Sequence, residues 1–174
     1  MCGRYIQLNK TNMIKKKFNL NSSLSEDIIS YNISPSQNSL ILLNNNEIKI
    51  EKAKWGYSFI NNKTNMRKNV INSRFETIKE KILFKDSYYN RKCIIPTNGY
   101  YEWHLEKEFK VPYFVHVDNK ESFYFAGIWK YYNFHETTKK VFTIITKPAN
   151  NLLNKIHKRM PIIFSHDEAT EYLY

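Results

Sequence analysis

Along much of the chain, short hydrophobic runs are separated by polar residues. This pattern is typical of β-strands. Each run is rich in β-branched or aromatic residues and ends in residues that favour turns. Asn44, Asn45 and Asn46 separate two such runs, which predicts a hairpin at this point. The predicted strands span residues 39–43, 47–52, 93–95, 100–104, 113–117, 122–129 and 141–146.

Other segments carry signals for short helices. Thr11 is a candidate cap for an amphipathic helix, and the apolar spacing after Arg74, over residues 75–83, predicts a second helix. Pro148 is suited to open a short helix, and the pair Ser165 and Glu168 has the spacing of a capping box. Strands with helices between and after them, without regular alternation, predict an α+β fold on a mainly antiparallel sheet.

The composition predicts a folded basic domain. A length of 174 residues with 42% apolar residues favours a single domain, residues 1–174, with room for a core. Lys and Arg number 27 against 16 Asp and Glu, which gives a formal net charge of +11. Such a charge attracts polyanions, nucleic acid first and an acidic membrane second. Abundant Asn and Ile indicate an AT-rich coding sequence, which accounts for part of the lysine content.

Several classes of site are not expected. The two cysteines, Cys2 and Cys93, form neither a disulfide framework nor a metal-type pair. The histidines lie too far apart for a metal site, and the isolated glycines form no phosphate loop, so we expect no metal and no cofactor. The chain opens without a signal-peptide pattern and has no membrane-length apolar run. We therefore expect a cytoplasmic protein with free thiols and no membrane partner.

Cys2 carries the most informative chemistry in the sequence. Because cysteine is small, the initiator methionine can be removed, and the mature chain then begins with an α-amine and a thiol on one residue. Their reference pKa values, about 7.7–8.0 and about 8.5, predict partial deprotonation of both groups at neutral pH. Such an aminothiol condenses with an aldehyde to a Schiff base and then closes a thiazolidine ring. The alternative is an ordinary small residue at a frayed terminus.

Four more residues are candidates for chemistry or binding. Glu102 lies inside an aromatic strand pattern, where burial would raise its pKa toward the range useful for proton transfer; the alternative is an exposed edge-strand residue. His157 follows a predicted short helix and precedes a strand, and it can act as an acid or be structural. Asn72 stands where a helix cap is commonplace. Arg4, beside Cys2, is either a phosphate ligand or a solvated charge.

Together these residues resemble the SRAP family, the SOS-response-associated peptidases or abasic-site-processing proteins. The resemblance runs along nearly the whole chain, and the joint order of its motifs is specific. The motifs are MCGRY at residues 1–5, YNISPSQ at 31–37, WGY at 55–57, INSRFET at 71–77, CIIPTNGYYEW at 93–103, PYF at 112–114, FAGIW at 125–129, TIIT at 143–146 and IHKRMP at 156–161.

The resemblance implies a barrel-like core of mainly antiparallel sheets flanked by short helices. It also implies an enzyme that senses abasic sites in single-stranded DNA during DNA repair and the SOS response. Family members cross-link themselves to the ring-opened deoxyribose through the terminal cysteine, as a stable thiazolidine. They are also credited with lyase activity and with removal of their own first methionine. A monomer suits such a role, with association to the nucleoid if the source is bacterial.

The resemblance assigns roles residue by residue. Asn72 would orient the α-amine, Glu102 would move protons, and His157 would protonate the sugar ring oxygen, so that the catalytic set is Cys2, Asn72, Glu102 and His157. Among the DNA-binding residues, the arginines would bind flanking phosphates and the tryptophans would contact the DNA, with Trp103 packed beside Glu102. This DNA-binding set is Arg4, Arg74, Arg159, Trp55 and Trp103.

Two departures from the family and two rival functions remain open. After Tyr57, relatives commonly carry Pro and Trp that wedge duplex ends apart, whereas this chain has Ser58 and Phe59. The chain also ends sooner after the 156–161 motif than relatives usually do. One rival is an N-terminal-nucleophile hydrolase, although Arg4 and the scarcity of glycine disfavour it. The other is a non-covalent single-stranded DNA-binding module that stacks bases on Trp55 and Tyr57.

Overall fold

Five strands close into a barrel at the centre of the molecule. The computed structural model describes residues 2–61, 64–118, 122–134 and 137–174. Around the barrel the strands follow the order β12–β4–β3–β8–β11 and return to β12. Neighbours pair antiparallel, except that β4 and β12 run parallel. The barrel strands are β3 (Asn38–Asn45), β4 (Glu47–Trp55), β8 (Lys92–Thr97), β11 (Phe123–Phe134) and β12 (Thr137–Pro148).

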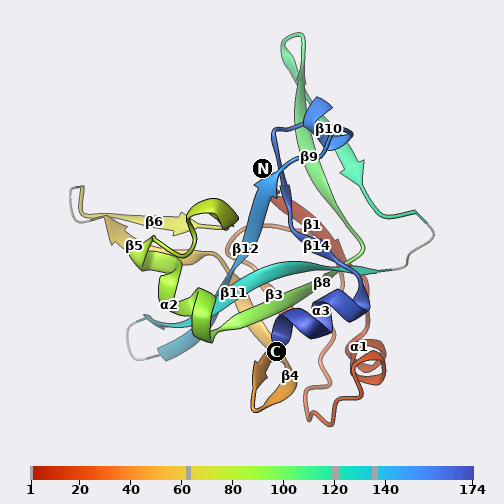
Figure 1. Ribbon diagram of the computed structural model, residues 1–174, viewed down its shortest axis with the longest axis vertical. Helices are drawn as coiled ribbons and strands as arrows, with labels where there is room; N and C mark the ends of the chain where they lie inside the picture. The colour runs from red at the N-terminus through yellow and green to blue at the C-terminus, as the bar shows by residue number, and fades with distance from the viewer. Residues whose placement is uncertain (1, 62–63, 119–121, 135–136) are drawn as a thin grey trace.

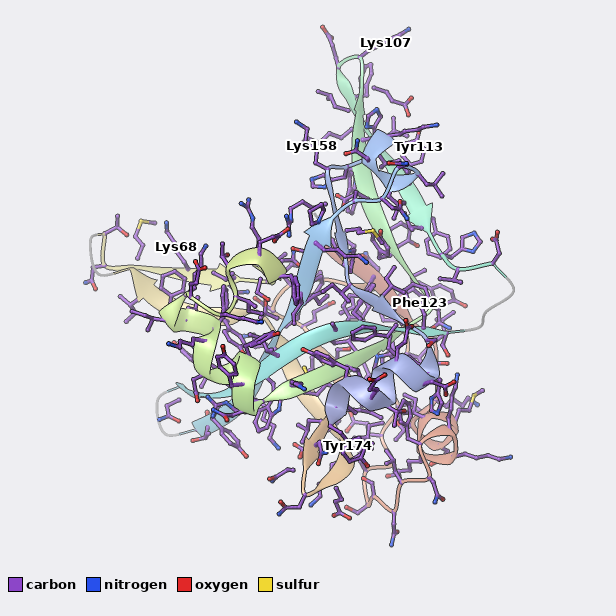
Figure 2. All side chains as sticks on the ribbon, in the orientation of Figure 1. Lys68, Lys107, Tyr113, Phe123, Lys158 and Tyr174 are labelled. Carbon is purple, nitrogen blue, oxygen red and sulfur yellow. The ribbon has the colours of Figure 1, made fainter. Side chains whose placement is uncertain are left out.

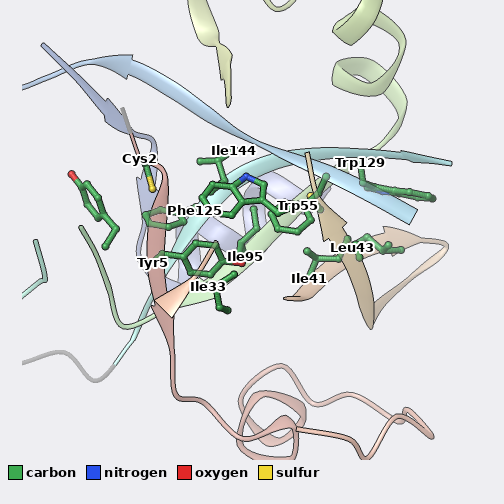
Figure 3. Packing of buried hydrophobic residues seen from close by; sticks show 14 of the residues in the cluster. Cys2, Tyr5, Ile33, Ile41, Leu43, Trp55, Ile95, Phe125, Trp129 and Ile144 are labelled. Carbon is green, nitrogen blue, oxygen red and sulfur yellow. The ribbon is translucent and has the colours of Figure 1, made fainter. Parts of the chain in front are cut away.

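The barrel interior is filled by aromatic and β-branched side chains. Alternate residues of a barrel strand point inward, and the inward set here is the apolar one. Figure 3 shows Tyr5, Trp55 and Phe125 packed together, with the Tyr5 and Trp55 ring centroids 5.1 Å apart in an edge-on arrangement. Both the fold class and the barrel-like core are confirmed.

A second, four-stranded sheet lies against the barrel in the order β10–β9–β1–β2. Its strands are β1 (Arg4–Gln7), β2 (Ser30–Ile33), β9 (Gly99–Glu106) and β10 (Phe109–Val115). The β9–β10 hairpin projects away from the barrel, at the top of Figure 1, and Figure 2 shows Lys107 at its tip. Gly99 is needed at the base of this arm, because a Cβ there would lie 2.4 Å from the Phe114 ring.

Short strands extend the barrel at the far end of β12. The strands β7 (Asn72–Arg74) and β13 (Arg159–Pro161) pair with residues 144–148 of β12, β7 in parallel and β13 antiparallel. The strand β14 (Ile163–Phe164) pairs with β11. A separate hairpin is formed by β5 (Tyr57–Asn61) and β6 (Met66–Val70), at the left of Figure 1. Because β7 and β13 both pair with the end of β12, the segments that begin at Asn72 and at Arg159 lie close to each other.

Every predicted strand overlaps an observed one, whereas the helix predictions had mixed success. The capping box of Ser165 and Glu168 is confirmed at the start of α3 (His166–Leu173). Thr11 is the first residue of α1 (Thr11–Lys17) rather than its cap, because its N–H and hydroxyl bond to Asp27 and to the Glu26 carbonyl. Pro148 ends β12 and opens no helix.

Two 3₁₀ turns stand near the site where α-helices were predicted. Residues 75–83 do not form one helix: η1 (Phe75–Thr77) is followed by extended backbone at Lys81, and α2 (Ile82–Asn90) begins after it. The segment after Pro148 contains only η2 (Leu153–Lys155). Over the described residues, no helix has the length and apolar character needed to span a bilayer.

Candidate active site

The predicted catalytic residues come from four segments that meet near the start of β1 and the end of β12. Cys2 lies two residues before the start of β1, Asn72 opens β7, and Glu102 lies in β9. His157 stands between η2 and β13. In Figure 1 the start of the chain lies between β9 and the arrowhead of β12, which is where these segments converge.

The Cys2 side chain is fully buried at the edge of the barrel core. The amide Nδ2 of Asn72 donates a hydrogen bond of 2.9 Å to the Cys2 carbonyl oxygen. The Oδ1 atom of the same amide is buried and has no hydrogen-bond partner in the described part of the chain. An orphaned acceptor next to Cys2 is suited to receive an N–H group, since buried acceptors normally have a partner.

The Cys2 thiol is held in its neutral form. Burial, and to a lesser extent the charge of Glu102, raise the pKa of the thiol far above its usual range. Reference values predict a partly deprotonated thiol for a chain that begins at Cys2, and burial in the folded chain acts against that ionisation. The thiol needs a base before it can act as a nucleophile.

Glu102 is a buried residue of a central strand, and not an exposed residue of an edge strand. Its strand β9 lies between β10 and β1, and 5% of the residue is exposed. The register pairs Arg4 with Tyr101, so that one further step along both strands places Glu102 opposite Gly3, the neighbour of Cys2. The charge of this carboxylate acts on the Cys2 thiol, whose pKa it helps to raise.

His157 is fixed through its ring nitrogen. The backbone N–H of Arg159 donates to Nδ1 at 3.0 Å, and the Arg159 carbonyl oxygen lies 3.1 Å from the same nitrogen. We assign the neutral ring a proton on Nε2, because Nδ1 then accepts the Arg159 N–H. A protonated ring can instead donate from Nδ1 to the carbonyl. Both charge states therefore have a partner, as a proton-transferring residue requires.

A further contact holds the loop of His157 against β9. The Nδ1 atom of His104 donates to the carbonyl oxygen of Ile156 at 3.0 Å. His104 follows Glu102 by two residues, on the same face of the strand. This bond therefore links the segment that carries His157 to the strand that carries Glu102.

An ion pair that sequence reasoning missed connects the segments of two predicted catalytic residues, Asn72 and His157. Arg159 donates from Nη1 and Nη2 to the two carboxylate oxygens of Glu76, each at 3.0 Å. Nη2 also donates to the Thr146 carbonyl at 2.8 Å, and the Thr146 hydroxyl donates to the Ser73 carbonyl at 3.2 Å. The hydrogen bond to Arg159 lowers the pKa of Glu76. We call Glu76, Thr146 and Arg159 the clamp, because they join the segment of Asn72 to that of His157.

A hollow with aromatic side chains in its lining lies on the four-stranded sheet, and Arg4, two residues after Cys2, contributes to it. It has a volume of about 400 Å³. Arg4 is half-buried there, and its Nη1 donates to Asn32 at 3.3 Å. Trp103 is exposed by 39%. We call this feature the aromatic hollow; its lining residues are Arg4, Tyr31, Asn32, Tyr101, Trp103 and Pro112.

The remaining predicted DNA-binding residues are placed differently. Arg74 is exposed at the end of β7, near the site. Arg159 is engaged by Glu76 within the clamp. Trp55 lies inside the barrel with no exposed surface, and its indole N–H donates to the Ile71 carbonyl at 2.9 Å. Tyr57 is also fully buried, so neither ring can stack on a base in this structure.

Matches to known proteins cover the whole chain. The family model described as SOS response associated peptidase (SRAP) matches residues 1–174. The chain belongs to the SRAP family.

Among the described residues, no group of three or more His, Cys, Asp or Glu side chains is placed to hold a metal ion.

Similar proteins carry names that refer to abasic sites. The abasic site processing protein YoqW of Bacillus subtilis is 34% identical over 181 residues, which cover 99% of this chain and 80% of that protein. The abasic site processing protein YoaM of the same organism is 33% identical, with 99% and 79% covered. A crystal structure of a Bacteroides thetaiotaomicron protein superimposes with a TM-score of 0.85 at 23% identity, covering 99% of this chain and 81% of that one. The two structures therefore share one fold over nearly the whole of this chain.

Proposed function

We propose that this protein recognises abasic sites in single-stranded DNA and joins itself to them covalently through Cys2. The observation that carries the proposal is the surroundings of Cys2: a neutral buried thiol, the Glu102 carboxylate whose charge acts on it, and the orphaned Asn72 acceptor. The names of the relatives support a role in repair of abasic sites. The cross-link would shield the lesion.

The reaction begins once Met1 has been hydrolysed from Cys2. Met1 lies outside the described residues, and its removal by the protein itself is part of the proposal. The freed α-amine of Cys2 attacks the aldehyde carbon of the ring-opened deoxyribose. Asn72 orients the amine, because its Oδ1 accepts an N–H while its Nδ2 holds the Cys2 carbonyl. Loss of one water then gives the Schiff base.

Ring closure follows at the Schiff base. Glu102 takes the thiol proton, since the neutral thiol is a poor nucleophile, and the sulfur attacks the imine carbon. A new S–C bond forms, the C=N bond becomes a single bond, and the nitrogen receives the proton that Glu102 carried. The product is a thiazolidine, and the whole condensation releases one water. Departure of the phosphate by β-elimination at the Schiff base stage would account for lyase activity.

His157 acts before the condensation. Most abasic deoxyribose is a closed hemiacetal; as its ring C–O bond breaks, the ring oxygen gains a proton and the C1′ hydroxyl loses one to water, which leaves the aldehyde. Nε2–H of His157 is the donor that its hydrogen bonds to Arg159 leave available. When the sugar opens next to Cys2, the aldehyde forms close to the α-amine that attacks it.

DNA contacts surround this centre. Arg4 and Arg74 are suited to bind the phosphates on either side of the lesion, as charged groups at the rim of the site. Trp103, in the aromatic hollow, offers a ring on which a neighbouring base can stack. Trp55 is left out of this interface because it is buried.

Replacement of Cys2 by serine tests the order of the two bond-forming steps. A mature Cys2→Ser chain keeps the amine and loses the thiol, so it should form a Schiff base that borohydride traps. Without borohydride, the adduct should disappear on a heated denaturing gel. Wild-type adduct should survive the same heating without reduction. A heat-stable serine adduct would rule out ring closure by sulfur.

A further inference from the structure

A lysine-lined groove lies at the opposite end of β12 from Cys2. Over the described residues, strands β4 and β12 pair at Lys54–Val141 and Trp55–Phe142 alone, and no pairing continues toward Thr137. The space between them forms part of a groove of about 760 Å³. We call it the lysine groove; its lining residues are Ile28, Ser30, Ile33, Ser36, Gln37, Asn38, Lys52, Ala53, Lys54, Thr138, Lys139 and Lys140.

The lining is suited to an extended anion. Four of the described lining residues are lysines, none is Asp or Glu, and none is aromatic. Lys52 forms an ion pair with Glu26, and Lys140 forms one with Glu51; both acids lie outside the lining. Hydroxyl and amide side chains complete the wall. Ammonium and hydroxyl donors without rings are the groups that follow a phosphodiester backbone, rather than its bases.

Positive charge is crowded at this end of the barrel. Lys140 is half-buried, and burial, with the nearby Lys49, lowers the pKa of its ammonium group. Its ammonium also lies 5.4 Å from the Trp129 ring centroid. Glu51 pairs with Lys140, and the exposed ammonium groups of Lys54 and Lys139 add positive charge on the open side of the groove.

The lysine groove adjoins the aromatic hollow across one strand. Ser30 and Ile33 of β2 line the groove, while Tyr31 and Asn32 of the same strand line the hollow. β2 is an edge strand of its sheet, so no further strand separates the two features on that side. The width of one strand, about 5 Å, is small compared with a few nucleotides.

We propose that the lysine groove is a second DNA site, which holds the backbone of the unpaired strand on one side of the abasic residue. The proposal rests on the proposed function, because the path starts at Cys2. Bases near the lesion stack in the aromatic hollow. The strand then crosses β2, and its phosphates follow the lysines toward the start of β12.

The test uses a double variant and a control of equal charge. Lys54→Glu with Lys139→Glu alters the two exposed lysines of the groove, and Lys16→Glu with Lys85→Glu alters two exposed lysines on α1 and α2. Both proteins lose the same net charge. Binding to labelled, lesion-free oligothymidine of about 6 and about 20 nucleotides is followed by fluorescence anisotropy over a range of salt. Cross-linking is followed separately on abasic oligonucleotides with a tail on the 5′ or the 3′ side only.

The groove variant should lose about 10-fold in affinity for the long oligonucleotide and less than about 2-fold for the short one. The slope of log affinity against log salt should fall by about 1.4, as expected for two lost phosphate contacts. Its cross-linking should slow on one tail polarity alone. Equal losses in both double variants would mean that only net charge matters and would overturn the proposal, as would an unchanged slope. Absence of cross-linking in every protein would instead refute the proposed function. The binding measurements would still test the groove, because they use lesion-free DNA.

Discussion

The two ends of β12 hold their polar side chains in different ways. At the end near Cys2, Thr146 and Arg159 are fixed by several hydrogen bonds, and Glu102 is buried. At the other end, Lys54 and Lys139 are exposed on an open groove. Bond-forming chemistry needs a few groups in fixed positions, whereas polyanion binding shares its energy among many charges. A single substitution at the end near Cys2 should therefore lower the rate of cross-linking strongly, whereas one in the lysine groove should lower the affinity for DNA only slightly.

Glu102→Gln should give the largest effect of any single change outside Cys2. The amide keeps the shape of the side chain but cannot take the thiol proton, so cross-linking should slow by about 10²–10⁴-fold. Single-turnover rates on an abasic oligonucleotide measure this, with lesion-free DNA binding as the check on folding. The matched control is Glu108→Gln in the exposed turn of the β9–β10 arm. If Glu102→Gln and its control react at the wild-type rate, Glu102 is not the proton carrier.

His157→Ala should discriminate between two forms of the lesion. The loss on a closed-ring abasic site should exceed, by at least about 10-fold, the loss on a substrate that presents an aldehyde already open. The reason is that His157 is proposed to assist ring opening and not the later condensation. Rates measured with both substrates decide the matter. Equal losses on the two would show that the residue is structural.

Glu76→Gln should slow cross-linking by about 10-fold without weakening DNA binding. The amide can accept only one of the two Arg159 bonds, so the clamp would loosen and the Asn72 and His157 segments would lose their relative position. Rate at saturating DNA and affinity for lesion-free DNA are measured side by side, with the exposed Glu80→Gln as the control. Tighter binding with an unchanged rate would mean instead that Glu76 competes with a phosphate for Arg159.

Alkaline pH should produce the smallest effect, on stability alone. Burial raises the pKa of the Cys93 thiol, as it does for Cys2 and for the Tyr5 hydroxyl. A folded-state pKa above the unfolded value means that stability is fully present below about pH 9 and is lost above it, as the unfolded thiol ionises. In that range, each buried thiol should lower the free energy of unfolding by about 1.4 kcal/mol per pH unit. Urea unfolding from pH 7 to 10 should show a shallower loss for Cys93→Ala, and identical slopes would contradict this.

Sequence pattern predicted the long strands because each carries its own repeat of apolar residues. It did not predict β7, which has three residues and no such repeat. That strand exists because Asn72 pairs with Ile144, far along the chain. In the same way, Thr11 was misread as a cap because its partner Asp27 comes from a later loop. Local signals specify local structure, and these partners lie beyond their range.

The site shows the same division. Cys2 and Glu102 are candidates chosen from their chemistry and motifs, and the register of β1 and β9, continued by one pair, sets Glu102 opposite Gly3. The clamp could not be predicted, because Glu76 and Arg159 are 83 residues apart and each is unremarkable in its own segment. Trp55 was chosen as an aromatic ring for DNA, but alternation along β4 turns it into the barrel. Burial is decided by the closed sheet, which no single strand reveals.

Intact mass of the reaction product tests the central claim most directly. The mature protein is mixed with a single-stranded oligonucleotide that carries one abasic site, and wild type is compared with Cys2→Ala. We predict for wild type a mass equal to the protein without Met1, plus the oligonucleotide, minus one water, in a species that persists under denaturing conditions. Cys2→Ala should give no such stable species. A folded wild-type protein with a free terminus that yields no adduct, or a Cys2→Ala variant that yields the same one, would contradict the thiazolidine mechanism.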